Sequence, residues 1–331
     1  MKNSDPDRNL ALELVRVTEA AALASGRFMG RNEKNASDHA AVEAMRIMLN
    51  TIDMTGTVII GEGEKDDAPM LFNGEIVGTG SVPSIDIAVD PIDGTSLLAM
   101  GRANALATVG ASDSGSMFDP GPFVYMNKIA VGPDAKNSID VDAPANDNLV
   151  NIARAKGCDV DDLTVVVLDR PRHEELIDEL RNTGARIRLI TDGDVAGAVM
   201  TAWPGSGIDV LMGIGGTPEG VLSACALKCM GGEIQGKLWP RNDNEKSLGQ
   251  KMGYDFNSVL QMEDLVSSDN CFFAATGITD GELVSGVKYF GDGARTHSLV
   301  MRSKSGTVRE VRSKHRWDKL MRFSQIMYDQ E

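Results

Sequence analysis

The sequence predicts an α/β fold in which a sheet contains parallel strand pairs. The second half of the chain repeats one order three times: an apolar strand, a polar corner and a helix. The strands of this repeat are residues 164–168, 187–190 and 209–212. Alternation of strands with helices is typical of parallel pairs joined by helical crossovers. Because ligands of such sheets bind at the carboxyl ends of the strands, we expect the three corners to form one site.

The N-terminal part of the chain predicts two helices. Residues 8–29 carry apolar side chains at helical spacing, and Gly30 ends the pattern. A second helix is expected to begin near Asp38 and to present one apolar face. Ser37 or Asp38 is a suitable N-cap, because a short polar side chain accepts from the first free N–H groups. Alternatively, Asp38 has a functional role, and its carboxylate faces a metal site.

Residues 85–95 form the most informative stretch, a buried strand that runs into a sharp turn. Apolar and acidic side chains alternate along it with the period of a strand. Since Pro91 has no N–H to donate, we expect strand pairing to end there. Asp90 and Asp93 then converge, and two such carboxylates become stable together when a divalent cation lies between them. With the Thr95 hydroxyl nearby, this predicts a phosphoryl-transfer site; an ordinary Asp-Gly turn is the alternative.

An earlier strand, residues 57–60, also ends in carboxylates. It runs into Gly61-Glu62-Gly63-Glu64, where two glycines flank the acidic side chains. If this segment is extended, Glu62 and Glu64 point to one side of it. The functional interpretation is a further set of metal ligands, and the alternative is a solvated acidic turn.

The chain is long enough for two domains. Further strands are expected at residues 106–109 and 123–131, and the segment 132–137 that follows is polar and rich in turn residues. We therefore divide the chain into residues 1–150, an N-terminal metal-binding phosphatase domain, and residues 151–331, a C-terminal α/β domain that completes the active site.

The three corners of the repeat each offer chemistry for a phosphorylated sugar. Arg170-Pro171-Arg172 presents two guanidinium groups that suit a phosphate, although a solvated basic turn explains it equally well. Asp192-Gly193-Asp194 can hold sugar hydroxyls or form a turn in which Asp194 caps the next helix, and the cap is favoured. Residues 213–220 resemble a phosphate-binding glycine loop without the Lys-Ser/Thr of nucleoside-triphosphate loops. Glu219 lies in the first turn of its helix, where it either complements the helix dipole or supplies a metal ligand.

The C-terminal part of the chain is expected to be rich in strands. Residues 271–275, 298–301 and 307–311 are strand-like, and Lys304-Ser305-Gly306 predicts a hairpin turn between the last two. The basic segment 309–316 is interpreted as a charged surface or a subunit contact.

The composition argues against some classes of partner. The net charge of −15 disfavours nucleic acid and anionic membranes. It also disfavours capture of a phosphorylated metabolite unless cations reverse the local field. No stretch has the apolar length of a signal-peptide core or a membrane span, so we expect a cytoplasmic protein. The four cysteines show no zinc or disulfide spacing, and Cys225 and Cys229 fit the core face of a helix.

Six motifs occur in an order and approximate spacing that resemble one known family, the class II fructose-1,6-bisphosphatases of bacteria. That family belongs to the lithium-sensitive sugar-phosphatase superfamily, which includes inositol monophosphatases, and the resemblance covers nearly the whole chain. The motifs are residues 35–38, 61–64, 90–95, 171–173, 192–194 and 215–220. Two departures are His39, where relatives have a small residue, and Thr217, which replaces a common alanine. His39 can alter metal preference or pH dependence.

The resemblance implies roles for individual residues. The implied metal ligands are Asp38, Glu62, Asp90, Asp93 and Glu219. The implied substrate contacts are Asp93, Gly94, Thr95, Tyr125, Arg170, Pro171, Arg172, Asp192, Gly193, Asp194 and Gly216. The implied catalytic residues are Thr95, Asp90 and Glu62. In this scheme Thr95 orients or helps to deprotonate a metal-activated water.

The implied activity is hydrolysis of the 1-phosphate of fructose 1,6-bisphosphate, which gives fructose 6-phosphate and phosphate in gluconeogenesis. Two or three Mg²⁺ or Mn²⁺ ions would serve each site. The implied fold is the layered αβαβα sugar-phosphatase sandwich, in a homo-oligomer that is a dimer or a tetramer. One alternative is a bifunctional enzyme that also accepts sedoheptulose 1,7-bisphosphate. An inositol-monophosphatase-like enzyme and a non-enzymatic sugar-phosphate sensor are further alternatives, which the arginine pair and the complete ligand set disfavour.

Overall fold

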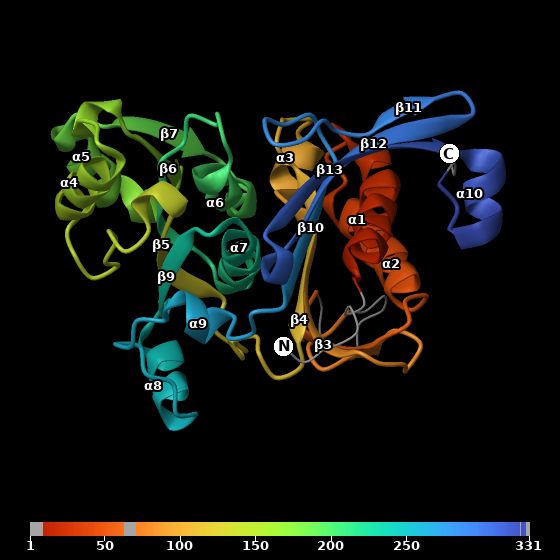
Figure 1. Cartoon of the computed structure of the whole chain (residues 1–331), viewed down its shortest axis with the longest axis horizontal. Helices are drawn as coiled ribbons and strands as arrows, with labels where there is room; N and C mark the ends of the chain where they lie inside the picture. The colour runs from red at the N-terminus through yellow and green to blue at the C-terminus, as the bar shows by residue number, and fades with distance from the viewer. Residues whose placement is uncertain (1–8, 63–70, 325, 329–331) are drawn as a thin grey trace, which may run out of the picture.

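The computed structural model describes residues 9–62, 71–324 and 326–328, and it confirms the layered α/β architecture. Two β-sheets alternate with three helical layers, in the order helix, sheet, helix, sheet, helix (Figure 1). Residues 63–70, which include the expected carboxylate of Glu64, lie outside the described residues. Among the described residues, no helix has the length and apolar character needed to cross a lipid bilayer.

The larger sheet contains strands from both ends of the chain. Its order is β11-β12-β10-β4-β3-β1-β2, and β13 pairs with β12. The strands are β1 (Thr55–Ile60), β2 (Ile76–Val77), β3 (Ser84–Asp93), β4 (Leu106–Asp113), β10 (Cys271–Gly277), β11 (Lys288–Phe290), β12 (Gly293–Arg302) and β13 (Thr307–Arg316). Helices α1 (Ala11–Ser25) and α2 (Lys34–Leu49) cover one face of this sheet and share a core with it. Since Ile85, Ile87 and Val89 of β3 belong to that core, Asp86 and Asp90 face the opposite side.

The smaller sheet has the order β7-β6-β8-β5-β9. Its strands are β5 (Tyr125–Val131), β6 (Thr164–Leu168), β7 (Arg186–Ile190), β8 (Val210–Gly216) and β9 (Glu233–Leu238). The expected parallel pairs are present, because β6 lies parallel to both β7 and β8. β5 is antiparallel to β8 and β9. Helices α4 (Ala145–Lys156) and α5 (Glu174–Thr183) pack on the outer face of this sheet.

The middle layer consists of α6 (Asp194–Ala202) and α7 (Thr217–Met230), which lie between the two sheets (Figure 1). Their apolar residues share one core with residues of both sheets. α7 is apolar on nearly all sides, as expected for a helix that is enclosed by other layers. Cys225 and Cys229 are buried in this core, as predicted.

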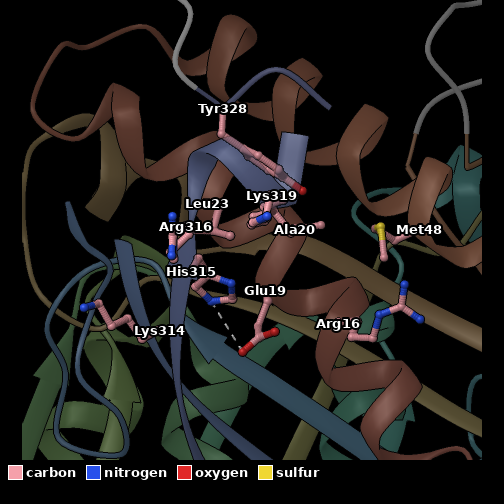
Figure 2. Close-up of a pocket in the computed structure, with 11 residues that line it drawn as sticks. Arg16, Glu19, Ala20, Leu23, Met48, Lys314, His315, Arg316, Lys319 and Tyr328 are labelled. Atoms are coloured by element: carbon pink, nitrogen blue, oxygen red, sulfur yellow. Dashed lines mark ion pairs between the residues drawn. The ribbon is translucent and has the colours of Figure 1, made fainter. Parts of the chain in front are cut away.

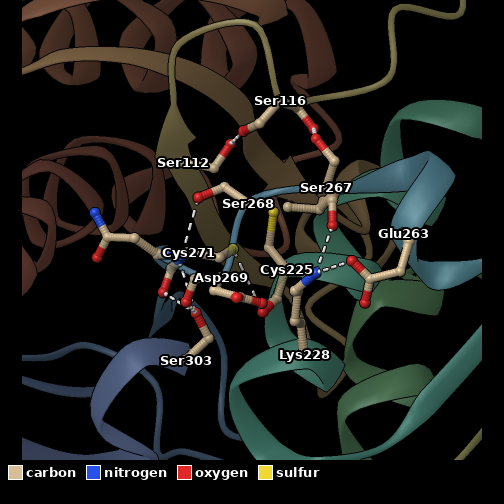
Figure 3. A network of polar contacts seen from close by, with 12 residues as sticks. Ser112, Ser116, Cys225, Lys228, Glu263, Ser267, Ser268, Asp269, Cys271 and Ser303 are labelled. Atoms are coloured by element: carbon tan, nitrogen blue, oxygen red, sulfur yellow. Dashed lines mark hydrogen bonds and ion pairs between the residues drawn. The ribbon is translucent and has the colours of Figure 1, made fainter.

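Polar contacts join α7 to the larger sheet and to α9 (Met262–Leu265) (Figure 3). The Lys228 ammonium donates to the Val266 carbonyl at 2.7 Å and pairs with Glu263 at 2.6 Å. The thiol of Cys271, at the start of β10, faces the carbonyl of Cys225 at 3.8 Å. These contacts fix the position of α7, and therefore of the side chains that its first turn carries.

Short elements complete the described chain. The remaining α-helices are α3 (Thr95–Ala99), α8 (Asp243–Lys251) and α10 (Trp317–Ser324). Single turns of 3₁₀-helix occur at η1 (Gly26–Phe28), η2 (Pro133–Ala135), η3 (Val160–Asp162), η4 (Pro171–His173) and η5 (Ser303–Ser305). η5 and Gly306 form the predicted hairpin turn, since β12 and β13 pair antiparallel on either side of them.

The second helix begins earlier than the sequence indicated. α2 starts at Lys34, so the prediction that Ser37 or Asp38 is its N-cap is wrong. The Ser37 N–H donates to the Glu33 carbonyl at 3.0 Å, and its hydroxyl donates to the Lys34 carbonyl at 2.7 Å. Asp38 therefore lies inside the helix, and its carboxylate is available for contacts outside it.

Strand pairing does not end at Pro91. The register of β3 against β4 shifts between Asp90 and Asp93, and the pairing resumes with Asp93 opposite Leu106. Such an irregularity accommodates a proline, which lacks the N–H that a regular ladder would use. It also changes the direction of the strand at the two carboxylates.

The expected glycine loop at residues 213–220 is not a loop. β8 continues through Gly216, and Gly213 to Gly216 pair with β5 residue by residue. α7 then begins at Thr217, with Pro218 in its first turn. The glycines are thus strand residues. At Gly215 and Gly216, side chains of the adjoining site occupy the space that a Cβ atom would need.

Sheet membership is not contiguous along the chain. β5 joins the smaller sheet before residue 150, and β10 to β13 return to the larger sheet after it. A division at residue 150 would fall inside α4. The chain therefore crosses between the sheets twice.

A separate cavity of about 570 Å³ opens beside α1 and β13 (Figure 2). Its wall includes Glu19 and His315, whose carboxylate and imidazole lie 3.7 Å apart and share the Thr296 hydroxyl. None of the residues that line this cavity lines the pocket at the strand ends.

Candidate active site

A pocket of about 270 Å³ lies where the carboxyl ends of strands from both sheets meet. Its lining includes these predicted site residues: Glu62, Asp90, Asp93, Gly94, Thr95, Tyr125, Arg170, Arg172, Asp192, Gly193, Asp194, Gly216 and Glu219. Asp38 and Pro171 are the two predicted residues that do not line it, although Asp38 contacts Thr95. The pocket is small and predominantly polar, which suits a compact charged ligand.

The end of β3 supplies two carboxylates whose positions are fixed by backbone groups. Asp90 accepts a hydrogen bond from the Ile92 N–H at 3.1 Å. Asp93 is buried and accepts from the Ala196 N–H at 3.3 Å, in the first turn of α6. An acidic group at a helix N-terminus is stabilised by the helix dipole. The larger sheet is therefore linked to the middle helical layer at the site itself.

Burial and mutual repulsion raise the pKa values of the carboxyl groups. Burial raises the pKa of Asp90 well above its ordinary value, and the neighbouring Asp93 and Glu219 add to the effect. Burial also raises the pKa of Asp93, with Asp194 as the largest charged contributor. Desolvation by surrounding protein atoms is the largest cause that raises the pKa of Glu62 to about 7, and repulsion from Asp38 and Glu219 adds to it. The residue as a whole is still exposed to solvent. Such groups need protons or cations to lie together at neutral pH.

Among the described residues, three buried carboxylate oxygens lack a hydrogen-bond partner, and two of them are Glu219 Oε2 and Asp194 Oδ1. Both belong to residues that line the pocket. A Cβ atom added at Gly216 would overlap Glu219 Oε2, so glycine is required for this carboxylate to turn inward. Oxygen ligands of this kind suit Mg²⁺ and Mn²⁺. The residues present therefore fit the divalent metal that the sequence predicted.

A second group of acidic residues has a different explanation. Asp159, Asp161 and Asp162 are exposed and bring their oxygens within 4.8 Å of one another. Asp159 and Asp162 form a reciprocal capping box at the start of η3. Their proximity follows from helix capping, and they do not line the pocket.

Thr95 connects the turn after β3 to α2. Gly94 adopts a positive φ of 90°, which a side chain would strain, and α3 begins at Thr95. The Thr95 hydroxyl lies 3.2 Å from Asp38 Oδ1 and 3.3 Å from the Ile92 carbonyl. Burial raises the pKa of Asp38, while this hydrogen bond and the charge of Lys34 oppose the rise. The threonine thus touches one of the predicted metal ligands.

The two arginines of the 170–172 corner have different surroundings. Arg172 donates twice to the Ile214 carbonyl, at 3.1 and 2.9 Å, and its guanidinium lies 5.1 Å from the centre of the Tyr125 ring. Arg170 is half-buried and has one longer ion pair with Asp192, at 3.6 Å. The structure therefore engages Arg172 within the protein and leaves Arg170 the more available of the two for an anion.

Asp194 does not cap α6, so that prediction is wrong. Gly193 is the N-cap residue, with a φ of 73°, and the Asp194 carboxylate instead pairs with the Lys128 ammonium at 2.9 Å. Asp192, the other acidic residue of this corner, accepts from the Ser96 N–H at 3.1 Å. Both side chains line the pocket, which leaves them positioned to meet a ligand.

Sequence reasoning missed two buried residues beside the pocket, Lys128 and His173. Lys128 is almost fully enclosed, and the available signal was a lysine in the middle of a largely apolar strand. His173 accepts from the Ile214 N–H at 2.7 Å and contacts the Leu168 carbonyl at 2.7 Å. Burial lowers its pKa, and its two ring contacts link the arginine corner to β8.

His39, the departure noted in the sequence, is exposed and lines a different cavity beside α1 and α2. The other departure, Thr217, is buried and its N–H donates to the Val124 carbonyl at 2.7 Å. Neither side chain lines the candidate active site.

The chain is similar to known proteins over nearly its whole length. Residues 8–315 match the family model described as bacterial fructose-1,6-bisphosphatase, glpX-encoded. The chain is 47% identical over 325 residues to the fructose-1,6-bisphosphatase 1 class 2 of Escherichia coli K12, which covers 94% of this chain and 96% of the relative. The class 2 enzymes named for E. coli O6:H1 and Shigella flexneri show the same identity and coverage. The chain belongs to the family of bacterial, glpX-type fructose-1,6-bisphosphatases.

Proposed function

We propose that this chain is a metal-dependent phosphatase that converts fructose 1,6-bisphosphate to fructose 6-phosphate and phosphate, the gluconeogenic direction. One observation carries the proposal. A single small pocket brings together a cluster of carboxylates, a threonine hydroxyl and a half-buried arginine. The relatives' names state the same bisphosphatase activity for those proteins.

We assign the metal-holding role to five carboxylates: Asp38, Glu62, Asp90, Asp93 and Glu219. Bound Mg²⁺ or Mn²⁺, in two or three sites, would supply an activated water and neutralise the phosphoryl oxygens. The raised pKa values of these groups support this assignment, because a divalent cation favours the ionised forms that crowding disfavours.

The chain itself positions the reacting groups. Thr95, held by Asp38, orients the attacking water and accepts or passes on its proton. Asp93, Gly94 and Thr95 contact the phosphoryl group at the turn after β3. Asp90 and Glu62 would contribute by holding the metal, and this is the catalytic role that we assign to them.

The other side of the pocket binds the rest of the sugar bisphosphate. We assign the distal phosphate to Arg170, beside Tyr125 and the Pro171–Arg172 turn, because its guanidinium has the weaker protein contact of the arginine pair. Asp192, Gly193 and Asp194 bind the sugar hydroxyls, and Gly216, at the end of β8, contacts the sugar at the pocket wall.

Phosphate release from fructose 1,6-bisphosphate, with Mn²⁺ or Mg²⁺ and with chelator, tests the proposal. Rapid release that chelator abolishes is the expected result. Sedoheptulose 1,7-bisphosphate and inositol 1-phosphate are assayed beside it to determine substrate class. Faster turnover of the monophosphate would assign the chain to the inositol-monophosphatase type. Tight binding of the bisphosphate without release would indicate a sensor.

We further propose that the protein acts in the cytoplasm as a dimer or tetramer. The four cysteines are free thiols, which suits a reducing compartment. The basic strand β13 lies at the edge of the larger sheet and is the proposed subunit contact. Light scattering on the protein as it elutes from a size-exclusion column gives the size of the oligomer. A monomer at micromolar concentration would reject the proposed dimer or tetramer.

A further inference from the structure

Lys128 is a buried cation that lies directly behind the pocket. Its side chain is 1% exposed, and its ammonium contacts Asp194 Oδ2 at 2.9 Å and the Gly216 carbonyl at 3.0 Å. Lys128 shares the inner face of β5 with Met126 and Ala130, which belong to the core around α6 and α7. Asp194, Gly216 and Glu219 line the pocket, whereas Lys128 does not. Lys128 therefore acts on a ligand through these neighbours or through its charge, and not by direct contact.

Two glycines make room for this arrangement. A Cβ atom at Gly215 would lie 2.8 Å from Lys128 Cε and 2.9 Å from its Nζ, and would overlap Asp194 Oδ2. At the next residue, Gly216, a Cβ atom would overlap the Glu219 carboxylate. The ion pair and Glu219 thus occupy the space that two consecutive side chains of β8 would otherwise fill.

The ion pair leaves one oxygen of Asp194 for a ligand. Lys128 contacts Oδ2, and Oδ1 is buried without a hydrogen-bond partner among the described residues. A buried acceptor of this kind is costly unless a donor satisfies it. Because Asp194 lines the pocket, a hydroxyl of the bound sugar is a suitable donor.

Lys128 also changes the charge balance of the carboxylates. Asp194 raises the pKa values of Asp93 and Glu219, whereas the charge of Lys128 lowers that of Glu219. The Lys128 side chain thus places a basic group beside residues assigned to metal binding. Like charges that share a partly buried site repel each other strongly.

We infer that Lys128 is a positioning residue that acts through Asp194 and Gly216. It holds Asp194 with one oxygen directed to the sugar, and its charge weakens the grip of Glu219 on a divalent cation. This inference rests on the proposed function for the identity of the sugar, but its effect on metal affinity is measurable without substrate.

Calorimetric titration with Mn²⁺, in the absence of sugar phosphate, tests the metal part. The variant Lys128→Met removes the charge and keeps much of the side-chain volume. We expect it to bind Mn²⁺ about tenfold more tightly, the scale of removing one charge from a partly buried site. Lys237→Met is the matched control, because Lys237 lies on neighbouring β9 and pairs with Asp142 near the surface, and its Mn²⁺ affinity should equal that of the parent. Equal affinity for Lys128→Met and the parent protein would overturn the inference.

Removal of Lys128 leaves the Asp194 carboxylate buried and unpaired, which can destabilise Lys128→Met. A second comparison, in which Asp194 is neutral, therefore does not depend on the folding of Lys128→Met. Asp194→Asn alone should bind Mn²⁺ more weakly than the parent, because a negative charge is lost. Adding Lys128→Met to Asp194→Asn should restore affinity by about tenfold. If the double variant binds Mn²⁺ as weakly as Asp194→Asn, Lys128 has no electrostatic role.

Kinetics test the positioning part. In Lys128→Met the Asp194 carboxylate loses the partner that orients it, so we expect the KM for fructose 1,6-bisphosphate to rise at least tenfold while kcat at saturating Mn²⁺ changes less than threefold. A fall in kcat with an unchanged KM would contradict the assigned role. If the parent protein releases no phosphate from this substrate, the proposed function fails, while the Mn²⁺ titrations still decide the electrostatic claim.

Discussion

At the scale of single residues, the site depends on side chains that the protein holds from two directions. Thr95 follows β3 in the chain, yet its hydroxyl contacts Asp38 on α2. Asp93 also follows β3 and is bound by the first turn of α6. Each of these groups is fixed by an element from a different layer, so small shifts between layers would change the geometry of the site.

Thr95→Ala tests the role assigned to this hydroxyl. We expect kcat for phosphate release to fall about 10²-fold or more, since a positioned proton acceptor is lost, and KM to change little. Thr307→Ala, on the exposed edge strand β13, is the control and should keep parental kinetics. Turnover within threefold of the parent in Thr95→Ala would reject the assignment.

The two arginines of one corner should respond differently to removal. Arg170→Ala is expected to raise the KM for the bisphosphate about tenfold to a hundredfold, with the melting temperature unchanged. Arg172→Ala is expected to lower stability by about 1–3 kcal/mol, because the Ile214 carbonyl loses its charged donors. Steady-state kinetics and thermal denaturation of both variants make the comparison. The reverse pattern would assign the distal phosphate to Arg172.

At the scale of elements, the strand ends and helix starts bring the carboxylates together. The register shift in β3 redirects the chain between Asp90 and Asp93. The continuation of β8 to Gly216 places Glu219 in the first turn of α7. Glycines at the end of β8 are required because side chains of α6 and α7 occupy the adjoining space.

Gly216→Ala should therefore disable the site. The added methyl group would displace the Glu219 carboxylate, so we expect loss of Mn²⁺ binding and of phosphate release, with a stability loss of about 1–3 kcal/mol from overpacking. Gly291→Ala is the matched control, since its Cβ would enter open space, and should change stability by no more than about 0.5 kcal/mol. Calorimetry and denaturant unfolding measure both effects. Parental Mn²⁺ affinity in Gly216→Ala would show that Glu219 does not need this space.

At the scale of the whole molecule, negative charge is concentrated where two sheets meet. The protein carries a net charge of −15, and several carboxylates of the pocket have raised pKa values. The metal-free folded state holds these groups together, whereas the unfolded chain separates them. Folding of the metal-free protein is therefore opposed by their ionisation.

This opposition predicts how stability depends on pH. A carboxyl group with a raised pKa binds protons more tightly when folded, so its contribution to the free energy of unfolding falls as pH rises from about 4.5 through its folded pKa, about 7 for Glu62. We expect the melting temperature in chelator to fall between pH 5 and pH 8. Saturating Mn²⁺ should raise the melting temperature more at pH 8 than at pH 5. An equal effect of Mn²⁺ at both pH values would argue against metal binding by these carboxylates.

Much of the architecture follows from local patterns in the sequence. The alternation of apolar and acidic side chains along residues 85–90 predicted the two faces of β3. The strand-corner-helix repeat predicted the parallel pairs of the smaller sheet. The start of α2 and the extension of β8 were predicted wrongly, because the helix begins before Ser37 and strand pairing continues past Gly213 when neighbouring elements support them. Local propensity does not contain that support.

The sequence by itself determined which chemical groups stand at the strand ends: carboxylates, a threonine, glycines and arginines within short motifs. Only the tertiary structure decided how they pair. It joined Asp194 to Lys128 rather than to the start of its own helix, and it engaged Arg172 while leaving Arg170 more available. The physical reason is that these contacts link residues distant in the chain. Their partners depend on how two sheets and the helices between them pack, which no local pattern records.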